Sequence, residues 1–239
     1  MRKIFCFLAL SSLALTSCSS SDDSNSSAAN GLLKKTIETD SEGNVVTSNY
    51  SYNGHKIKKV EDSTGERTEF TYSGDLITKI QYFYDDGGLE QTNLYTYDSA
   101  GKLVMFQRLE PDDQYGAKEM YVYNSNGTVS VTRFIGDATS QTEDGGTATV
   151  YFQNGEVSEI DSDSGGDLLY TYDNKNNPGK DITGFGAVTS FADLGVSGIN
   201  HNLLSDDGTY TYTYNDAGYP VTSTENFSGD VTSTQYFYN

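Results

Sequence analysis

Aromatic and hydroxyl-bearing residues alternate along most of this chain with a period of two. In the stretch 93–108 the rings of Tyr95 and Tyr97 flank Thr96, a turn follows from Asp98 to Gly101, and a second strand-like run comes after it. Residues two apart in a strand project from the same face. The stretch therefore predicts a hairpin with its rings on one face and its hydroxyl groups on the other.

The same unit recurs down the chain as pairs of rings that close alternate strands. These pairs are Tyr50/Tyr52, Phe70/Tyr72, Tyr95/Tyr97, Tyr121/Tyr123, Tyr170/Tyr172, Tyr212/Tyr214 and Tyr236/Tyr238, and Val150/Phe152 fills the same slot in a degenerate copy. Most second positions lie 20 to 29 residues apart, which fits two strands and two turns, but 42 residues separate Tyr172 from Tyr214. The longer spacing predicts an insertion, which we place at 173–204.

Glycine marks the turns between these strands, because a tight hairpin needs a positive φ. The turn dipeptides are Asn53-Gly54, Ser73-Gly74, Asn126-Gly127, Asn154-Gly155, Ala217-Gly218 and Ser228-Gly229. Counted from these signals, residues 32–239 predict an all-β domain, an antiparallel meander of roughly 16 strands.

The edges of this sheet indicate whether it closes. An open sheet would leave residues 32–39 and 231–239 unpaired, and unpaired edges invite association between molecules. We therefore expect a closed or nearly closed barrel-like sheet with its tyrosines inward; the alternative is an open single-layer or sandwich-like sheet. Within the insertion, Ala187–Leu194 predicts about two helical turns that cap one end of the sheet or, alternatively, line a binding site.

The repeat resembles known families at this point. Tyr95-x-Tyr97-Asp98-x-x-Gly101-x-Leu103 resembles the Tyr-Asp (YD) repeat of Rhs-type shell proteins. Residues 32–239 resemble uncharacterised Bacteroidota lipoprotein domains described as porin-like, which also place an Asn-Pro stretch and a later Asn-containing loop between repeats, as Asn177-Pro178 and 200–202 do here. The resemblance implies a β fold and an envelope location, but no activity. This chain departs from it at Gly179, where a bulky apolar residue is expected.

The N-terminus has the features of an export signal. A short basic region is followed by an apolar run, Ile4–Leu15, that is too short to span a bilayer. Leu15-Thr16-Ser17-Cys18 then resembles the lipobox of bacterial lipoproteins. We predict a lipoprotein signal peptide over 1–17 and lipid attachment at Cys18; the alternative is an ordinary cleaved signal followed by a chance cysteine.

Residues 18–31 are rich in Ser and Asp and predict a flexible tether. A Ser/Asp run after the lipidated cysteine resembles the surface-export signal of Bacteroidota lipoproteins, and a solvated linker without an address is the alternative. We expect the protein to be anchored in the outer membrane through the lipid on Cys18, facing either the periplasm or the cell surface.

The net negative charge of the chain and the polar residues on one face of the sheet exclude some partners and environments. The formal net charge is −19, and removing residues 1–17 with their two basic residues makes it −21. A field of this sign repels nucleic acid, so we expect no nucleic-acid partner. The face without rings carries Lys56, Lys58, Thr132 and Glu225, whereas a transmembrane strand must show lipid an apolar band. The folded domain is thus expected not to span the membrane.

The sequence offers little for catalysis. His55 and His201 lack the partners of a metal or nucleophile motif, and we expect a solvated turn residue and a hydrogen-bonding residue, respectively. Paired carboxylates lie mostly in turns beside glycine, where they cap hairpins. Asp161-x-Asp163-x-Gly165-x-Asp167 faintly resembles a calcium loop but lacks the bidentate Glu, so a hairpin turn is favoured. We predict no catalytic residue, no metal site and no cofactor.

These observations favour a non-enzymatic binding or scaffolding role, with a glycan or another envelope protein as partner. The alternatives are a glycan-active hydrolase that uses turn carboxylates and a purely structural surface protein. Rings placed by the repeat are expected to be structural. Rings outside its period are better ligand candidates: Phe83, Tyr115, Phe185, Phe191 and Tyr219.

Overall fold

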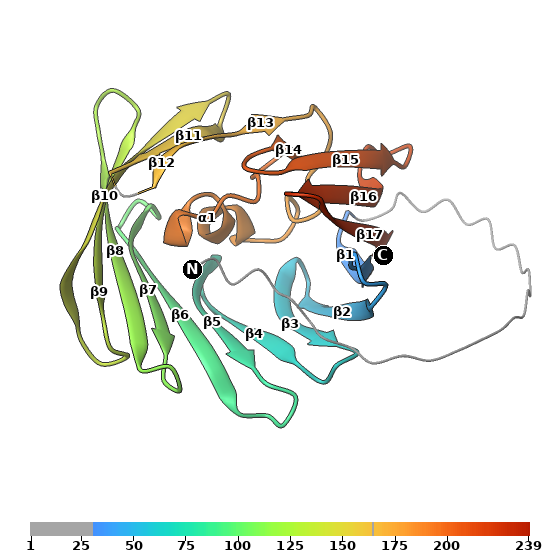
Figure 1. Cartoon of the computed structure of the whole chain (residues 1–239), viewed down its shortest axis with the longest axis horizontal. Coiled ribbons are helices and arrows are strands. Elements are labelled where there is room, and N and C mark those ends of the chain that lie inside the picture. Colours follow the sequence, from blue (N-terminus) through green and yellow to red (C-terminus); the bar gives the residue numbers. More distant parts are fainter. Residues whose placement is uncertain (1–30, 164) are drawn as a thin grey trace, which may run out of the picture.

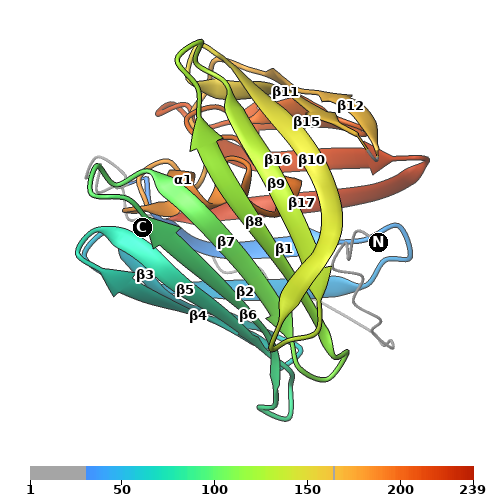
Figure 2. The ribbon, with the colours of Figure 1, turned by 90° about the vertical axis from the view of Figure 1, so that its left-hand side faces the viewer.

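The computed structural model describes residues 31–163 and 165–239. The predicted signal peptide over 1–17, the lipid attachment at Cys18 and the predicted tether, apart from Gly31, lie outside the described residues. The described chain forms one sheet of 17 strands that curves around a short helix (Figures 1 and 2). No helix in the described ranges is long and apolar enough to cross a membrane.

In chain order the elements are β1 (Leu33–Thr39), β2 (Val45–Asn53), β3 (Lys56–Asp62), β4 (Arg67–Ser73), β5 (Leu76–Phe83), β6 (Leu89–Tyr97), β7 (Leu103–Glu110), β8 (Tyr115–Tyr123), β9 (Val129–Gly136), β10 (Gln141–Gln153), β11 (Glu156–Ser162), β12 (Gly166–Leu169), β13 (Thr171–Tyr172), α1 (Phe185–Thr189), η1 (Ala192–Leu194), β14 (Leu203–Ser205), β15 (Thr209–Tyr214), β16 (Pro220–Phe227) and β17 (Asp230–Tyr238).

The first and last strands pair with each other and close the sheet. β17 lies antiparallel to β1, with Tyr236 opposite Thr36 and Ser233 opposite Thr39. Beyond the ladder, the amide of Asn239 donates to the carbonyl of Leu32 at 3.0 Å. The predicted antiparallel meander with a barrel-like closure is confirmed, and the open or sandwich-like alternative is wrong.

One seam in the barrel is not sealed. The strand expected to end in Tyr170 and Tyr172 is interrupted at Tyr170, so that β12 pairs with β11 whereas β13 pairs with β14. β14 in turn meets β15 through the single pair Ser205 and Thr209. The barrel is therefore nearly closed, and the division into β12 and β13 explains 17 strands where about 16 were predicted.

The rings of the repeat face the interior, as predicted. Tyr95 and Tyr121 are buried, with 6% and 4% of their surface exposed. The residues between the rings are exposed on the outer face: Ser51, Thr71, Thr96, Thr171 and Thr213. Val150, at the degenerate copy, is fully buried in the same core as the tyrosines.

The second tyrosine of a pair has a hydrogen-bonding role. The β5–β6 ladder ends at Lys79 opposite Leu94, and just past it the Tyr97 hydroxyl donates to the carbonyl of Ile77 at 2.7 Å. Tyr52 and Tyr172 do the same for the carbonyls of Leu33 and Val157. A buried carbonyl without a partner is costly, so each ring satisfies the backbone where neighbouring strands separate.

The predicted insertion, 173–204, ends in the first two residues of β14, and its part before that strand, 173–202, lies inside the ring of strands (Figure 1). We call residues 173–202 the plug. Its Val188 and Phe191 belong to the same buried core as Tyr95 and Tyr121. The two helical turns expected over 187–194 are split into α1 and η1. Asp193 and the next residue have positive φ of 58° and 53°, a conformation that a right-handed helix cannot contain.

Candidate ligand-binding site

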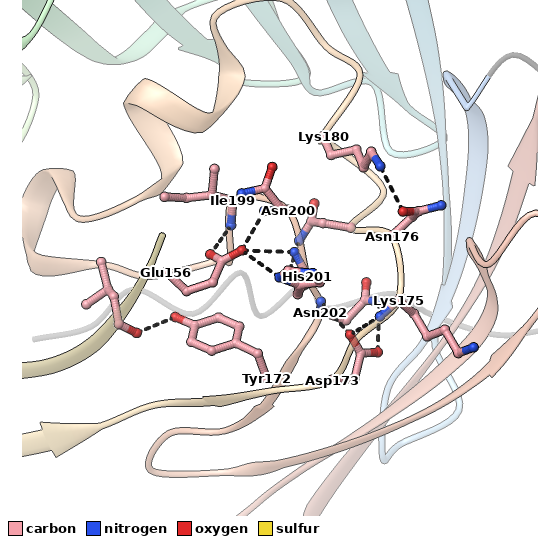
Figure 3. A network of polar contacts seen from close by, with 12 residues as sticks. Glu156, Tyr172, Asp173, Lys175, Asn176, Lys180, Ile199, Asn200, His201 and Asn202 are labelled. Carbon is pink, nitrogen blue, oxygen red and sulfur yellow. Dashed lines mark hydrogen bonds and ion pairs between the residues drawn. The ribbon is translucent and has the colours of Figure 1, made fainter. Parts of the chain in front are cut away.

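Buried carboxylates hold the plug inside the barrel, and Glu156 of β11 is the clearest case (Figure 3). Only 3% of its surface is exposed. Its carboxylate accepts hydrogen bonds from the backbone amides of Ile199, Asn200 and His201 at 2.8, 2.7 and 3.1 Å. The His201 ring nitrogen Nδ1 lies 3.2 Å from the same carboxylate, which is the hydrogen-bonding role expected for it.

Asp173 ties the two ends of the plug together. Its carboxylate accepts from the amide and side chain of Asn202, both at 3.0 Å, and from the Tyr214 hydroxyl. Burial raises the pKa of Asp173, but the hydrogen bonds from Tyr214, Lys175 and Asn202 outweigh it and hold the pKa below its ordinary value.

The two asparagine stretches singled out in the sequence also meet in the plug. The amide of Asn177 donates to the carbonyl of Asn200 at 2.9 Å, and the Asn177 side chain donates to the carbonyls of Ser197 and His201. A side chain at position 179 would displace Phe185, because a Cβ on Gly179 would lie 2.6 Å from Cδ1 of Phe185.

An internal charge cluster fixes η1 to the wall of β7, β8 and β9. It consists of Glu119, Asp193, Arg133, Arg108 and Glu110. Arg133 bridges Glu119 and Asp193, each at 3.2 Å, and Arg108 lies 2.6 Å from Asp193 and 3.3 Å from Glu110. Glu119 also accepts from the Tyr121 hydroxyl and from the amide of Asp193. Complete burial, aided by the charge of Asp193, raises the pKa of Glu119 to about 7.

A cavity of about 420 Å³ lies between the plug and the first six strands. Phe185, Val188 and Thr189, from α1, form its floor. Its walls carry the rings Tyr50, Phe70, Tyr82 and Tyr95, together with aliphatic side chains and the hydroxyls of Ser48 and Thr68. The volume lies within the range of small-molecule sites, roughly 300–1,000 Å³. We call it the main cavity.

A second cavity of about 260 Å³ adjoins the first. Tyr50 and Phe185 line both. The second cavity continues along the plug past Pro178 and Gly179 to Tyr212 and Tyr236 of the closing strands. The plug therefore fills the side of the barrel near β7–β11 and leaves space beside β1–β6 and β15–β17.

Two carboxylates, Glu38 and Asp62, line the main cavity at the end away from the plug. At the other end of their strands, Leu32 and Ile57 pack against Ile182 of the plug. Burial raises the pKa of Glu38, and the charges of Glu225, Asp62 and Asp40 raise it further. Burial likewise raises the pKa of Asp62. The atom Oδ1 of Asp62 is buried without a hydrogen-bond partner among the described residues.

The rings outside the repeat period, predicted as ligand candidates, lie in different surroundings. Of those five, only Phe185 lines a cavity described here. Phe83 lies under the Arg67 guanidinium and Tyr115 near that of Arg108. Phe191 packs edge-on between Tyr121 and Phe152, while Tyr219 bonds to Asp181. Three of the four rings in the main cavity's walls, Tyr50, Phe70 and Tyr95, belong to pairs of the repeat, and Tyr82 does not.

Glu225 was expected on the face without rings, and this is wrong. Tyr210, on the inner face, donates its hydroxyl to Glu225 at 3.1 Å, and Glu225 is close enough to raise the pKa of Glu38. β16 carries no ring pair of its own. Its phase is therefore set by its register with β15 and β17, which the sequence pattern does not reveal.

The remaining candidates have local structural contacts. Asp98 accepts from the amides of Ala100 and Lys102, and Asp86 from that of Gly88, so these acids stabilise turns. His55 is exposed, and its ring nitrogen contacts the carbonyl of Asp181.

The stretch that faintly resembled a calcium loop is a hairpin, with Asp161 opposite Asp167. Asp163, between them, accepts from the amide and hydroxyl of Thr147.

Comparison with known proteins finds similarity only among solved structures. No protein-family model matches the chain. No curated protein matches it either. Two solved structures that it resembles are described as porin-like proteins, from Bacteroides uniformis (TM-score 0.37, 12% identity) and Bacteroides vulgatus (TM-score 0.36, 11% identity). Each comparison covers 87% of this chain and 98% of the other. The chain is thus similar to proteins described as porin-like, while its own strand pairing establishes the nearly closed all-β barrel.

Proposed function

We propose that this chain is a lipid-anchored envelope protein, held in the outer membrane through Cys18, that binds a small saccharide inside its barrel without turning it over. The main cavity supports this proposal. Its volume of about 420 Å³ suits a ligand of one or two sugar rings. Aromatic side chains offer apolar faces to the C–H faces of a sugar, and hydroxyl and carboxylate groups at the same walls accept and donate to its hydroxyls.

Binding rather than scaffolding is favoured because the main cavity is lined by inward-facing side chains of β1–β6 and by α1. The buried carboxylates Glu119 and Glu156, and the half-buried Asp173, already accept hydrogen bonds from backbone amides of the plug. Their role is therefore to hold the floor of the cavity in place.

The test is isothermal titration of the full-length protein, in detergent, with neutral and amino mono- and disaccharides. Thr68 lines the main cavity, so Thr68→Phe should fill it and weaken binding at least tenfold. Thr71→Phe, on the exposed outer face of the same strand, is the matched control and should bind like wild type. Absence of saturable binding across the panel would overturn the proposal, as would full affinity in Thr68→Phe.

A second candidate, hydrolysis of a glycan, is favoured by one observation. Glu38 and Asp62 both line the main cavity, and glycosidases use two carboxylates on either side of the scissile bond. This candidate predicts release of reducing ends from an oligosaccharide, abolished in Glu38→Gln. Hydrolysis of the oligosaccharide by the wild-type protein would show that the protein is a hydrolase and would overturn the proposal of binding without turnover.

A further inference from the structure

The inner wall of the barrel is electrically uneven, and this asymmetry concerns the ligand. On the side of β7 and β9, the inward guanidinium groups of Arg108 and Arg133 lie in ion pairs with Asp193, Glu119 and Glu110. On the side of β1 and β3, Glu38 and Asp62 line the main cavity. Within residues 31–163 and 165–239, neither of these two carboxylates forms an ion pair with a lysine or arginine.

Three basic residues on or beside these strands have other partners. Lys59 pairs with Glu61 at 2.8 Å, and Arg67 pairs with Glu69 at 3.0 Å. Lys35 lies over the ring of Phe237, 4.2 Å from its centroid, and Phe237 is exposed on the outer face. The charges that raise the pKa of Glu38 are instead those of carboxylates, Glu225, Asp62 and Asp40.

Negative charge without a counter-charge is costly in a partly buried site. Asp62 has a side-chain hydrogen bond with Ser48, but its buried Oδ1 lacks a hydrogen-bond partner among the described residues. A bound cation beside Glu38 and Asp62 would supply the counter-charge. The rings of Tyr50, Phe70, Tyr82 and Tyr95 in the same cavity attract a cation through their π faces and cover an apolar body.

We propose that the main cavity selects a ligand with a sugar-sized ring and a free protonated amine, which contacts Glu38 and Asp62 while the ring lies among the aromatic side chains. This inference rests on the proposed saccharide binding and adds the charge of the ligand. The chain's net charge of −19 acts in the same direction, because it concentrates cations near the protein.

The experiment compares matched ligands that differ only in the amine. The full-length protein in detergent is titrated at pH 7 with glucosamine and its β-1,4-linked dimer, and with the N-acetylated forms of both. We expect the free amines to bind at least tenfold more tightly. Glu38→Gln and Asp62→Asn should each reduce this preference at least threefold, whereas Glu61→Gln, a carboxylate paired with Lys59, should leave it unchanged.

Stability provides a control for folding of the variants. Glu38→Gln and Asp62→Asn remove repulsion between neighbouring carboxylates, so without ligand each should melt at or above the wild-type temperature. Equal affinity for the amine and acetylated sugars would overturn the inference and leave the saccharide site intact. Binding of neither set would overturn the saccharide site as well, and saturable binding of calcium alone that displaces the amine would assign the carboxylates to a metal instead.

Discussion

Phe185 owes its position to a single missing side chain. A Cβ on Gly179 would lie 2.6 and 2.8 Å from two atoms of the Phe185 ring, so only glycine leaves the ring where it is. That ring lines both cavities. The family resemblance leads one to expect a bulky apolar residue at this position, and such a residue would occupy the space of the ring. Glycine at this position therefore has a local cause in the floor of the site.

Gly179→Ala tests this packing. The added methyl group must displace Phe185, which should lower the free energy of unfolding by about 1–3 kcal/mol, as overpacking does elsewhere. Chemical denaturation measures the change. Gly195→Ala is the control within the same plug, because a Cβ added there would lie 3.6 Å from its nearest neighbour, the carbonyl oxygen of Ala192, which is an ordinary contact distance. Equal midpoints for the two variants would show that the ring moves without cost.

At this scale the sequence predicts most of the interior. Residues two apart share a face, so rings such as Tyr95 and Tyr121 could be placed inward from their spacing alone. Glu225 was placed on the wrong face because its strand has no rings to mark its phase. Glu38 and Asp62, close to the turns, look like turn acids in the sequence, and only the curvature of the sheet shows that they line the cavity.

Among the elements, the plug depends most on polar contacts. Glu119 accepts the amide of Asp193, Glu156 accepts those of 199–201, and Asp173 accepts that of Asn202. The donors are backbone amides, which every residue here carries. No side-chain pattern could therefore reveal these contacts in the sequence, although the length of the insertion and its aliphatic content were visible.

Glu156→Gln should loosen the plug. One carboxylate oxygen becomes an NH₂ group that faces amide donors, so at least one donor loses its partner, at a cost of about 2 kcal/mol in unfolding free energy. Hydrogen exchange should speed up at the amides of 199–201 before it does in the strands. Glu159→Gln lies on the same strand, is half-buried and serves as the control. Unchanged exchange at 199–201 would contradict the anchoring role.

For the molecule as a whole, the internal charge cluster links stability to pH. The pKa of Glu119 is about 7 in the folded protein and near 4.5 in the unfolded chain, so the fold binds the proton more tightly. The stability that comes from this proton is complete below about pH 4.5 and is lost as the pH rises through about 7. The groups that face Glu119 are Tyr121, Arg133 and Asp193.

Glu119→Gln should remove this dependence. Between pH 4.5 and 7 the wild type should lose about 1–3 kcal/mol of unfolding free energy relative to the variant. Denaturation of both proteins at several pH values measures the difference, and Glu61→Gln, an exposed carboxylate, controls for general charge effects. A difference between wild type and Glu119→Gln that stays constant with pH would mean that Glu119 is ionised throughout.

The pairing of β1 with β17 joins the two ends of the described chain. The two strands lie at opposite ends of the described chain, so the sheet cannot shut until the last strand has joined. The plug precedes β14–β17 in the chain but lies inside the barrel that they complete (Figure 1). The pairing of β1 with β17 therefore encloses the plug. The cavity between the plug and β1–β6 is the part of the enclosed space that the plug does not fill.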